Sequence, residues 1–172
     1  MYNFENLINR IPNEIINRMK NSMQDYYWHP EGNVYIHTEL VFNCLKKHND
    51  KDLLLAAIFH DMGKPETQTI RARDKDFNGD ISKLSLKDLK ISNIGHEYKC
   101  EKYIDKYFYL FSDISTNIKK VKEICNYHLK AHLYISGKLK KEKKRKDFEN
   151  LKYFDELIKF EYCDANSNKK YR

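Results

Sequence analysis

Apolar residues recur at intervals of three and four residues through most of the chain, and this periodicity constrains the fold more than any other feature. Spacing of this kind places one apolar stripe on each helix. The run Leu53–Phe59 is different, because its side chains are apolar nearly all round, which is typical of a helix buried on every side. We therefore predict an all-α fold around a central helix over 52–61, which Gly63 and Pro65 end.

Further helices are predicted on both sides of this central one. The same spacing indicates helices over 13–27, 33–48, 96–111, 121–132 and 154–164. Asn33 is the expected N-cap of the second. The periodicity fails between residues 66 and 94, where Asn78-Gly79 indicates a hairpin within a long irregular segment. No segment shows convincing strand alternation, so the predicted class is all-α.

Length and composition favour one folded domain over residues 1–172. The chain is 41% apolar and carries 13 tyrosines and 9 phenylalanines, which is too aromatic for a disordered chain. Its longest apolar run is far shorter than the ~20 residues of a membrane span, and residues 1–6 do not resemble a secretory leader. We therefore expect a soluble cytoplasmic protein without a membrane partner.

The four cysteines lie far apart in the sequence, and no two of them form the C-x-x-C pair of a zinc ribbon or a redox motif. Each falls on a predicted helix, where a free cysteine behaves as a small apolar residue. We therefore expect buried, reduced side chains at Cys44, Cys100, Cys125 and Cys163.

The net charge of +7 is concentrated in one segment. Residues 138–146 read KLKKEKKRK, with seven bases and one acid, so this segment accounts for +6 and the rest of the chain for +1. A cluster of this kind can hold the phosphate backbone of a nucleic acid. It is equally typical of a solvated loop or helix end. Charge alone leaves both interpretations open.

Polar side chains interrupt the apolar stripes. His37, His96, His128 and Asp164 each lie on the apolar side of a different predicted helix, and His60-Asp61 ends the central helix. A buried polar group without a partner costs roughly 2–7 kcal/mol, so each of these needs a partner. A single such histidine is most often a hydrogen-bonded core residue, but four helices that each direct a histidine or aspartate inward favour a shared metal ion. A ligand set without thiols argues against a structural zinc.

The order His37, His60-Asp61, Asp164 resembles the H…HD…D signature of the HD-domain metal-dependent phosphohydrolase superfamily. Three stretches extend the similarity, namely HDMGKPET at 60–67, WHPEGNV at 28–34 and GHE at 95–97. They are most similar to the HD domain of bacterial CCA-adding tRNA nucleotidyltransferases. No nucleotidyltransferase catalytic head is recognised, so we expect the hydrolytic module to stand alone.

The resemblance implies a bundle of five or more helices around a metal site. It assigns a first metal to His37, His60, Asp61 and Asp164. It assigns a second metal to His96 and His128, with Asp61 bridging the two ions. His132 lies four residues after His128 on the same helix face and is the alternative ligand. Two ions at about 3.5–4 Å suit in-line displacement at phosphorus.

Asp61, Lys64 and Glu97 are the expected catalytic residues. Lys64 lies one turn beyond Asp61, where its ammonium could contact a phosphate oxygen, although a lysine at a helix end is often simply solvated. Glu97 could act as a general base or orient a ligand, or it could lie exposed in a first helical turn. His29 and His48 match no ligand position.

These expectations combine into a metal-dependent phosphohydrolase that cleaves a phosphomonoester or phosphodiester of a nucleotide or an RNA terminus through a metal-activated water. The cofactor is one or two divalent transition-metal ions (Mn, Fe, Co, Ni or Zn), and residues 138–146 are the candidate nucleic-acid contact. Two alternatives stay open. One is hydrolysis of free nucleoside mono- or triphosphates, and the other is a non-catalytic module that binds RNA or a partner.

Overall fold

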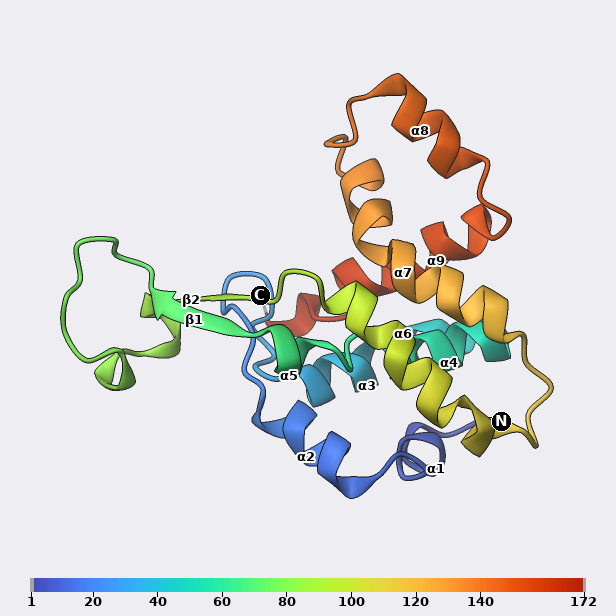
Figure 1. Ribbon diagram of the computed structural model, residues 1–172, viewed down its shortest axis with the longest axis horizontal. Coiled ribbons are helices and arrows are strands. Elements are labelled where there is room, and N and C mark those ends of the chain that lie inside the picture. The colour runs from blue at the N-terminus through green and yellow to red at the C-terminus, as the bar shows by residue number, and fades with distance from the viewer. Residues whose placement is uncertain (1, 172) are drawn as a thin grey trace.

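The computed structural model describes residues 2–171, which form a helical body with one projecting two-stranded arm (Figure 1). The helices are α1 (Phe4–Ile8), α2 (Asn13–Asn21), α3 (Val34–Leu45), α4 (Lys51–Phe59), α5 (Lys64–Thr67), α6 (His96–Tyr107), α7 (Ile118–Ile135), α8 (Glu142–Glu149) and α9 (Phe154–Asn166). Short 3-10 helices follow α3 at Lys46–His48 and α6 at Phe108–Phe111. Within the described range, no helix is long and apolar enough to cross a membrane.

Helix α4 is the centre of the body. It packs against α3, α6, α7 and α9, and all side chains of the run Leu53–Phe59 are buried. The helix begins at an N-cap, Asp50, whose carboxylate accepts hydrogen bonds from the N–H groups of Asp52 and Leu53. The prediction of a central helix buried on every side is confirmed. Because α4 is enclosed, residues that directly follow it also lie inside the protein.

Most predicted helix ends differ from the structure by a few residues, and the largest difference is at the end of the first predicted helix. Asn33 caps α3 as expected, since its Oδ1 accepts from Ile36 N–H at 2.9 Å. Helix α2, however, ends at Asn21 and not at 27. Residues 22–33 form a loop that closes through a β-bridge between Met23 and Asn33. Gly32 permits this return with a φ of 107°, a backbone conformation that other residues rarely adopt.

The segment 66–94 contains the one sheet among the described residues. Strands β1 (Thr69–Ala72) and β2 (Leu89–Ser92) pair antiparallel, with Ile70 opposite Ile91. A hairpin is therefore present, but Asn78-Gly79 lies in the long loop 73–88 and is not a two-residue turn between the strands. The strands were not predicted from the sequence. β1 has no buried residue and β2 buries only Ile91, so neither strand shows the alternation of apolar and polar residues that indicates a strand.

A disulfide between Cys44 and Cys163 joins α3 to α9, with the two Cα atoms 5.6 Å apart. The expectation of four reduced cysteines is therefore wrong for these two residues. It is confirmed for Cys100 and Cys125, which are buried and free. The two bonded cysteines are 119 residues apart, and only the packing of α3 on α9 brings them together.

Candidate metal centre

Polar side chains from five parts of the chain meet at the C-terminal end of α4. His60 and Asp61 follow that helix directly, and each of the four surrounding helices contributes one further residue, namely His37 from α3, His96 from α6, His128 from α7 and Asp164 from α9. All six except Asp164 are buried, and the side chain of Asp164 is 16% exposed. The structure thus brings together every residue that the sequence predicted as a metal ligand.

Two glycines allow α6 to approach the turn after α4. A Cβ atom on Gly63 would lie 2.4 Å from the carbonyl oxygen of His96, so only glycine fits there. Gly95, the N-cap of α6, has a φ of 81°, which favours glycine. The conformation at Gly95 starts the helix at His96, and the close contact at Gly63 sets the imidazole of His96 beside Asp61. These contacts give a physical reason for the glycines in the HDMGK and GHE stretches.

Asp61 lies between two groups of ligand atoms. Its Oδ2 is 3.3 Å from His60 Nε2 and 3.7 Å from His37 Nε2. The Oδ1 of Asp164 is 2.8 Å from His37 Nε2 and 4.0 Å from His60 Nε2, which completes the first group. On the other side, Asp61 Oδ1 is 3.2 Å from His96 Nε2. The two carboxylate oxygens of Asp61 therefore face different groups.

The second group consists of His96 and His128 with Asp61. The Nε2 atoms of the two histidines are only 3.1 Å apart. The ligand atoms of Asp61, His96 and His128 all lie within 4.8 Å of one another, and the same holds for His37, His60 and Asp61. Asp61 is common to both sets, as a bridging carboxylate requires.

All four histidines are held by hydrogen bonds on the side away from the centre. The Nδ1–H of His60, His96 and His128 donates to the backbone carbonyl three residues earlier, at 2.8, 2.7 and 2.6 Å. The Nδ1–H of His37 donates to the Glu31 carboxylate at 2.8 Å. An acceptor at Nδ1 places the ring proton there, so His60, His96 and His128 in their neutral form direct an Nε2 lone pair into the centre. His37 differs, because it has a carboxylate at each ring nitrogen, Glu31 at Nδ1 and Asp164 at Nε2.

The atoms that face the centre are therefore nearly all electron-pair donors. His96 and His128 direct two lone pairs at each other, which is repulsive unless a cation lies beside them. His60 Nε2 and both carboxylate oxygens of Asp61 are buried without a well-formed hydrogen bond from any described residue. Lys64 compensates in part, because its ammonium is 2.7 Å from Asp61 Oδ2. The donor set fits one or two divalent transition-metal ions bound by imidazole and carboxylate.

The charges in the centre shift the pKa values of its groups. Burial by itself would raise the pKa of Asp61, but His60 and Lys64 outweigh it and hold the pKa well below its usual value. Burial likewise opposes ionisation of Asp164, and the hydrogen bond with His37 lowers its pKa nonetheless. Burial lowers the pKa of His128 to about 3, with a contribution from His96. Two carboxylates and a neutral imidazole are thus in the protonation states that metal binding requires.

Glu31 was not identified from the sequence, although it lies in the WHPEGNV stretch. It is buried, and its Oε1 accepts from His29 Nδ1–H at 3.0 Å as well as from His37. Its Oε2 accepts from the side chain of Asn168 at 2.9 Å. Glu31 thereby connects a ligand of the centre to the C-terminal segment. The position of Glu31 inside the WHPEGNV motif was the one sequence signal that it belongs to the site. Only the fold shows that it faces His37.

The structure separates the two candidate histidines of α7. His128 Nε2 faces the centre, whereas His132 pairs through Nδ1 with Glu161 at 2.8 Å and its side chain is 46% exposed. Glu161 is buried beside Asp164, and burial followed by the charge of Asp164 raises its pKa. The geometry therefore favours His128 as the ligand.

Lys64 and Glu97 differ in position. Lys64 is buried, lines the cleft described below, and donates to Gln24 Oε1 at 2.5 Å in addition to its contact with Asp61. Glu97 lies on the far side of His96, with its Oε2 3.7 Å from Nδ1. The Nδ1–H of His96 already donates to the Asn93 carbonyl, and Glu97 Oε2 has no hydrogen-bond partner among the described residues, so Glu97 neither holds the ring nor lines the cleft.

A cleft of about 480 Å³ opens over the centre. Asp61, His96, His128 and Asp164 line its floor, while His37 and His60 lie beneath. His29, which had matched no ligand position, lines the cleft as well. A volume of this size is within the range of small-molecule sites, about 300–1,000 Å³.

The sequence was compared with protein-family models, curated proteins and solved structures. The model of the HD domain matches residues 34–157, which is more than half of the chain. The curated proteins and the solved structures gave no significant match. Members of the HD domain family are generally metal-dependent hydrolases, in agreement with the ligand set at the end of α4. The chain therefore belongs to the HD domain family.

Proposed function

We propose that this protein is a metal-dependent phosphohydrolase that cleaves a phosphomonoester or phosphodiester of a nucleotide or an RNA terminus. The observation that supports it is the arrangement of the four imidazoles, each anchored at Nδ1 and each with its Nε2 in one of the two ligand groups that share Asp61. Such an arrangement is costly to keep in a protein that binds no cation. The closer relationship to CCA-adding enzymes stays a prediction from the motifs.

The ligands are proposed in two sets, His37, His60, Asp61 and Asp164 for one ion, and Asp61, His96 and His128 for a second. When bound, such ions activate water as a nucleophile and neutralise phosphate oxygens. Metal binding also displaces a proton from His37, because its bonds to Asp164 and Glu31 overcome burial and raise its pKa to about 9.

The remaining polar residues bind and orient. The ammonium of Lys64 lies at the cleft beside Asp61, where it can donate to a non-bridging phosphate oxygen. Gln24 holds that ammonium in place through its Oε1. Glu31 orients His37 from outside the ligand sets.

Metal content and turnover test the proposal together. Protein purified without chelator is analysed for transition metals, then assayed with p-nitrophenyl phosphate and bis(p-nitrophenyl) phosphate in the presence of Mn²⁺. We expect one or two bound ions and turnover of at least one ester by the wild type. Asp61→Asn keeps the shape of the side chain but removes the bridging charge, and both metal and activity should be lost.

Asp76→Asn is the matched control, because it makes the same chemical change at an exposed position in the loop of the arm. It should retain both metal and turnover. A wild-type protein that holds no metal after reconstitution with Mn²⁺, Co²⁺ or Ni²⁺ would overturn the proposal. Metal without turnover of either ester would leave a metal-binding module and remove the catalytic claim.

A further inference from the structure

The rim of the cleft is apolar and exposed. Trp28 from the loop 22–33 lines the cleft with 63% of its surface exposed, and Ile135 at the end of α7 lines it with 51% exposed. Leu129, six residues earlier on α7, also lines the cleft and is 39% exposed. Large apolar side chains gathered around one opening mark a recognition surface. An indole suits a flat partner such as a nucleobase, which stacks on aromatic side chains.

A basic loop begins directly after this rim. Helix α7 ends at Ile135, and Gly137, with a φ of 68°, turns the chain back. The N–H groups of Lys138 and Leu139 both donate to the carbonyl of Leu133, at 2.8 and 2.9 Å, which holds the start of the loop against the helix end. The basic loop, residues 138–141, therefore starts beside the end of α7, where Ile135 lines the cleft.

The ammonium groups of this loop have no acidic partner among the described residues. Lys138, Lys140 and Lys141 are exposed, and none forms an ion pair there. The bases at the end of the segment differ, since Lys146 pairs with Glu142 at 2.8 Å and Arg145 with Glu149 at 3.6 Å within α8. Lys143 and Lys144 of α8 are likewise exposed and form no ion pair with a described residue, so three of the five unpaired bases of the segment lie in the loop that follows Ile135.

We propose that the cleft receives the end of a single-stranded nucleic acid, with the terminal base against Trp28 and the following phosphates along the basic loop. The proposal rests on the phosphohydrolase function proposed above and specifies its substrate as a polymer. A free nucleotide would occupy the cleft and leave the loop, which lies outside it, without a partner. A nucleic-acid strand that continues past Ile135 places successive phosphates beside unpaired ammonium groups. The counterions released from these phosphates gain entropy, which favours binding.

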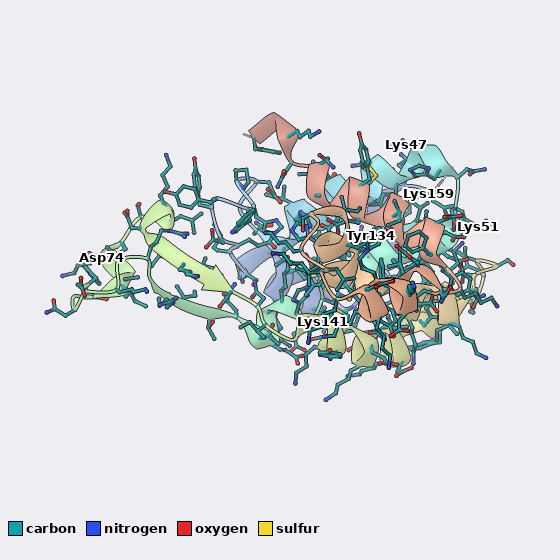
Figure 2. The ribbon with its side chains drawn as sticks, turned by 90° about the horizontal axis from the view of Figure 1, so that it is seen from above. Lys47, Lys51, Asp74, Tyr134, Lys141 and Lys159 are labelled. Atoms are coloured by element: carbon teal, nitrogen blue, oxygen red, sulfur yellow. A yellow bond between two sulfur atoms is a disulfide. The ribbon has the colours of Figure 1, made fainter. Side chains whose placement is uncertain are left out.

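Binding is measured by fluorescence anisotropy with the whole metal-loaded protein and a labelled oligouridylate of about 12 nucleotides, within the range of single-strand sites. A gel at the end of the titration verifies that the probe is intact. The test variant is Lys138→Gln/Lys140→Gln/Lys141→Gln. The matched control is Lys47→Gln/Lys51→Gln/Lys159→Gln, which removes the same charge from exposed lysines that lie together and apart from Lys141 (Figure 2).

The salt dependence of the affinity shows whether the phosphates lie along the basic loop or are attracted by the net charge of the whole protein. Each phosphate contact to a single strand contributes about 0.7 to the slope of log K against log salt. Loss of three contacts should lower the slope by about 2 and the affinity by roughly 10-fold or more in the loop variant. The control should stay within about 0.5 of the wild-type slope. Trp28→Ala should weaken binding by roughly 5- to 100-fold without a change in slope.

Turnover provides the second readout. The ratio of kcat/KM for an oligonucleotide with a terminal phosphate to kcat/KM for p-nitrophenyl phosphate should fall about 10-fold in the loop variant, and it should not change in the control. Equal slopes in the two lysine variants would overturn the proposal. Binding of the wild type to phosphatidylserine vesicles in place of the oligonucleotide would also overturn it.

Failure of the proposed function is distinguishable from failure of this proposal. If neither the wild type nor the two lysine variants hydrolyse p-nitrophenyl phosphate, the phosphohydrolase assignment fails. The salt slopes then still decide whether the basic loop binds nucleic acid. If the ester is hydrolysed and the slopes do not differ, the enzyme acts on small phosphate esters and the polymer is excluded.

Discussion

The helical body and the β1–β2 arm (residues 69–92) hold their polar side chains in different ways. In the body, the partners at the metal centre come from residues as far apart as His37 and Asp164. At the tip of the arm, partners are local, as where Asp80 accepts from Ser82 N–H and Asp74 from Asp76 N–H. Figure 2 shows Asp74 at the far end of the arm, away from the body.

The strands of the arm and the two ends of its loop contact the body, and the ammonium of Lys87 lies over the ring of Tyr26. Arg73 donates to Asp25 at 2.9 Å and lies over the ring of Tyr27, and Ile91 N–H donates to the same carboxylate. The geometry of the centre therefore depends on the packing of the whole body, whereas the tip of the arm depends on hydrogen bonds within its own loop. Substitutions of the same kind should have very different effects in the two regions.

Replacement of a phenylalanine by alanine should show the largest difference in stability between the body and the arm. Phe160 is fully buried, and its ring centroid lies 5.3 Å from that of His60 and 6.4 Å from that of His128. Phe160→Ala should lower the free energy of unfolding by about 3–5 kcal/mol, because it leaves a cavity in the core. Phe77→Ala, in the exposed loop of the arm, should cost less than about 1 kcal/mol. Urea unfolding followed by circular dichroism measures both, and equal losses would contradict the comparison.

The disulfide should have the next largest effect. It fixes α9 to α3 one residue before Asp164. Cys44→Ser/Cys163→Ser should lower the free energy of unfolding by about 2–4 kcal/mol, since the unfolded chain regains the freedom of a long loop. A dithiol reductant should lower the Tm of the wild type in the same way. The double variant is the control, and a further loss of Tm on reduction there would show that the reductant acts elsewhere.

Glu31→Gln should change stability less than the two variants above and should act mainly on metal affinity. The amide keeps the shape of the side chain but removes the charge that fixes His37 through Nδ1. We expect metal affinity to fall about 10- to 100-fold, as for other partners of metal-bound histidines, with Tm measured in chelator nearly unchanged. Competition with a chromogenic chelator measures the affinity. Glu39→Gln, a half-exposed position on α3 with His37, is the control, and an equal loss there would refute the role of Glu31.

Much of the body follows from local sequence. Apolar spacing predicted the longer helices α2, α3, α4, α6, α7 and α9, and the all-round apolar run Leu53–Phe59 indicated which one lies at the centre. The short helices α1, α5 and α8 were not predicted. The inward positions of His37, His96, His128 and Asp164 follow from the same spacing, because a side chain on an apolar stripe faces the core. The order of those residues, together with His60-Asp61, was sufficient to indicate the family.

Other features were decided only by the tertiary structure. The Cys44–Cys163 bond and the contact of Glu31 with His37 depend on how α3 meets α9 and on the path of the loop 22–33, which no local pattern encodes. The choice between His128 and His132 depends on which imidazole reaches Asp61 and which one meets Glu161. Sequence periodicity specifies which face of a helix is buried, but the neighbour on that face is set by the packing of the whole chain.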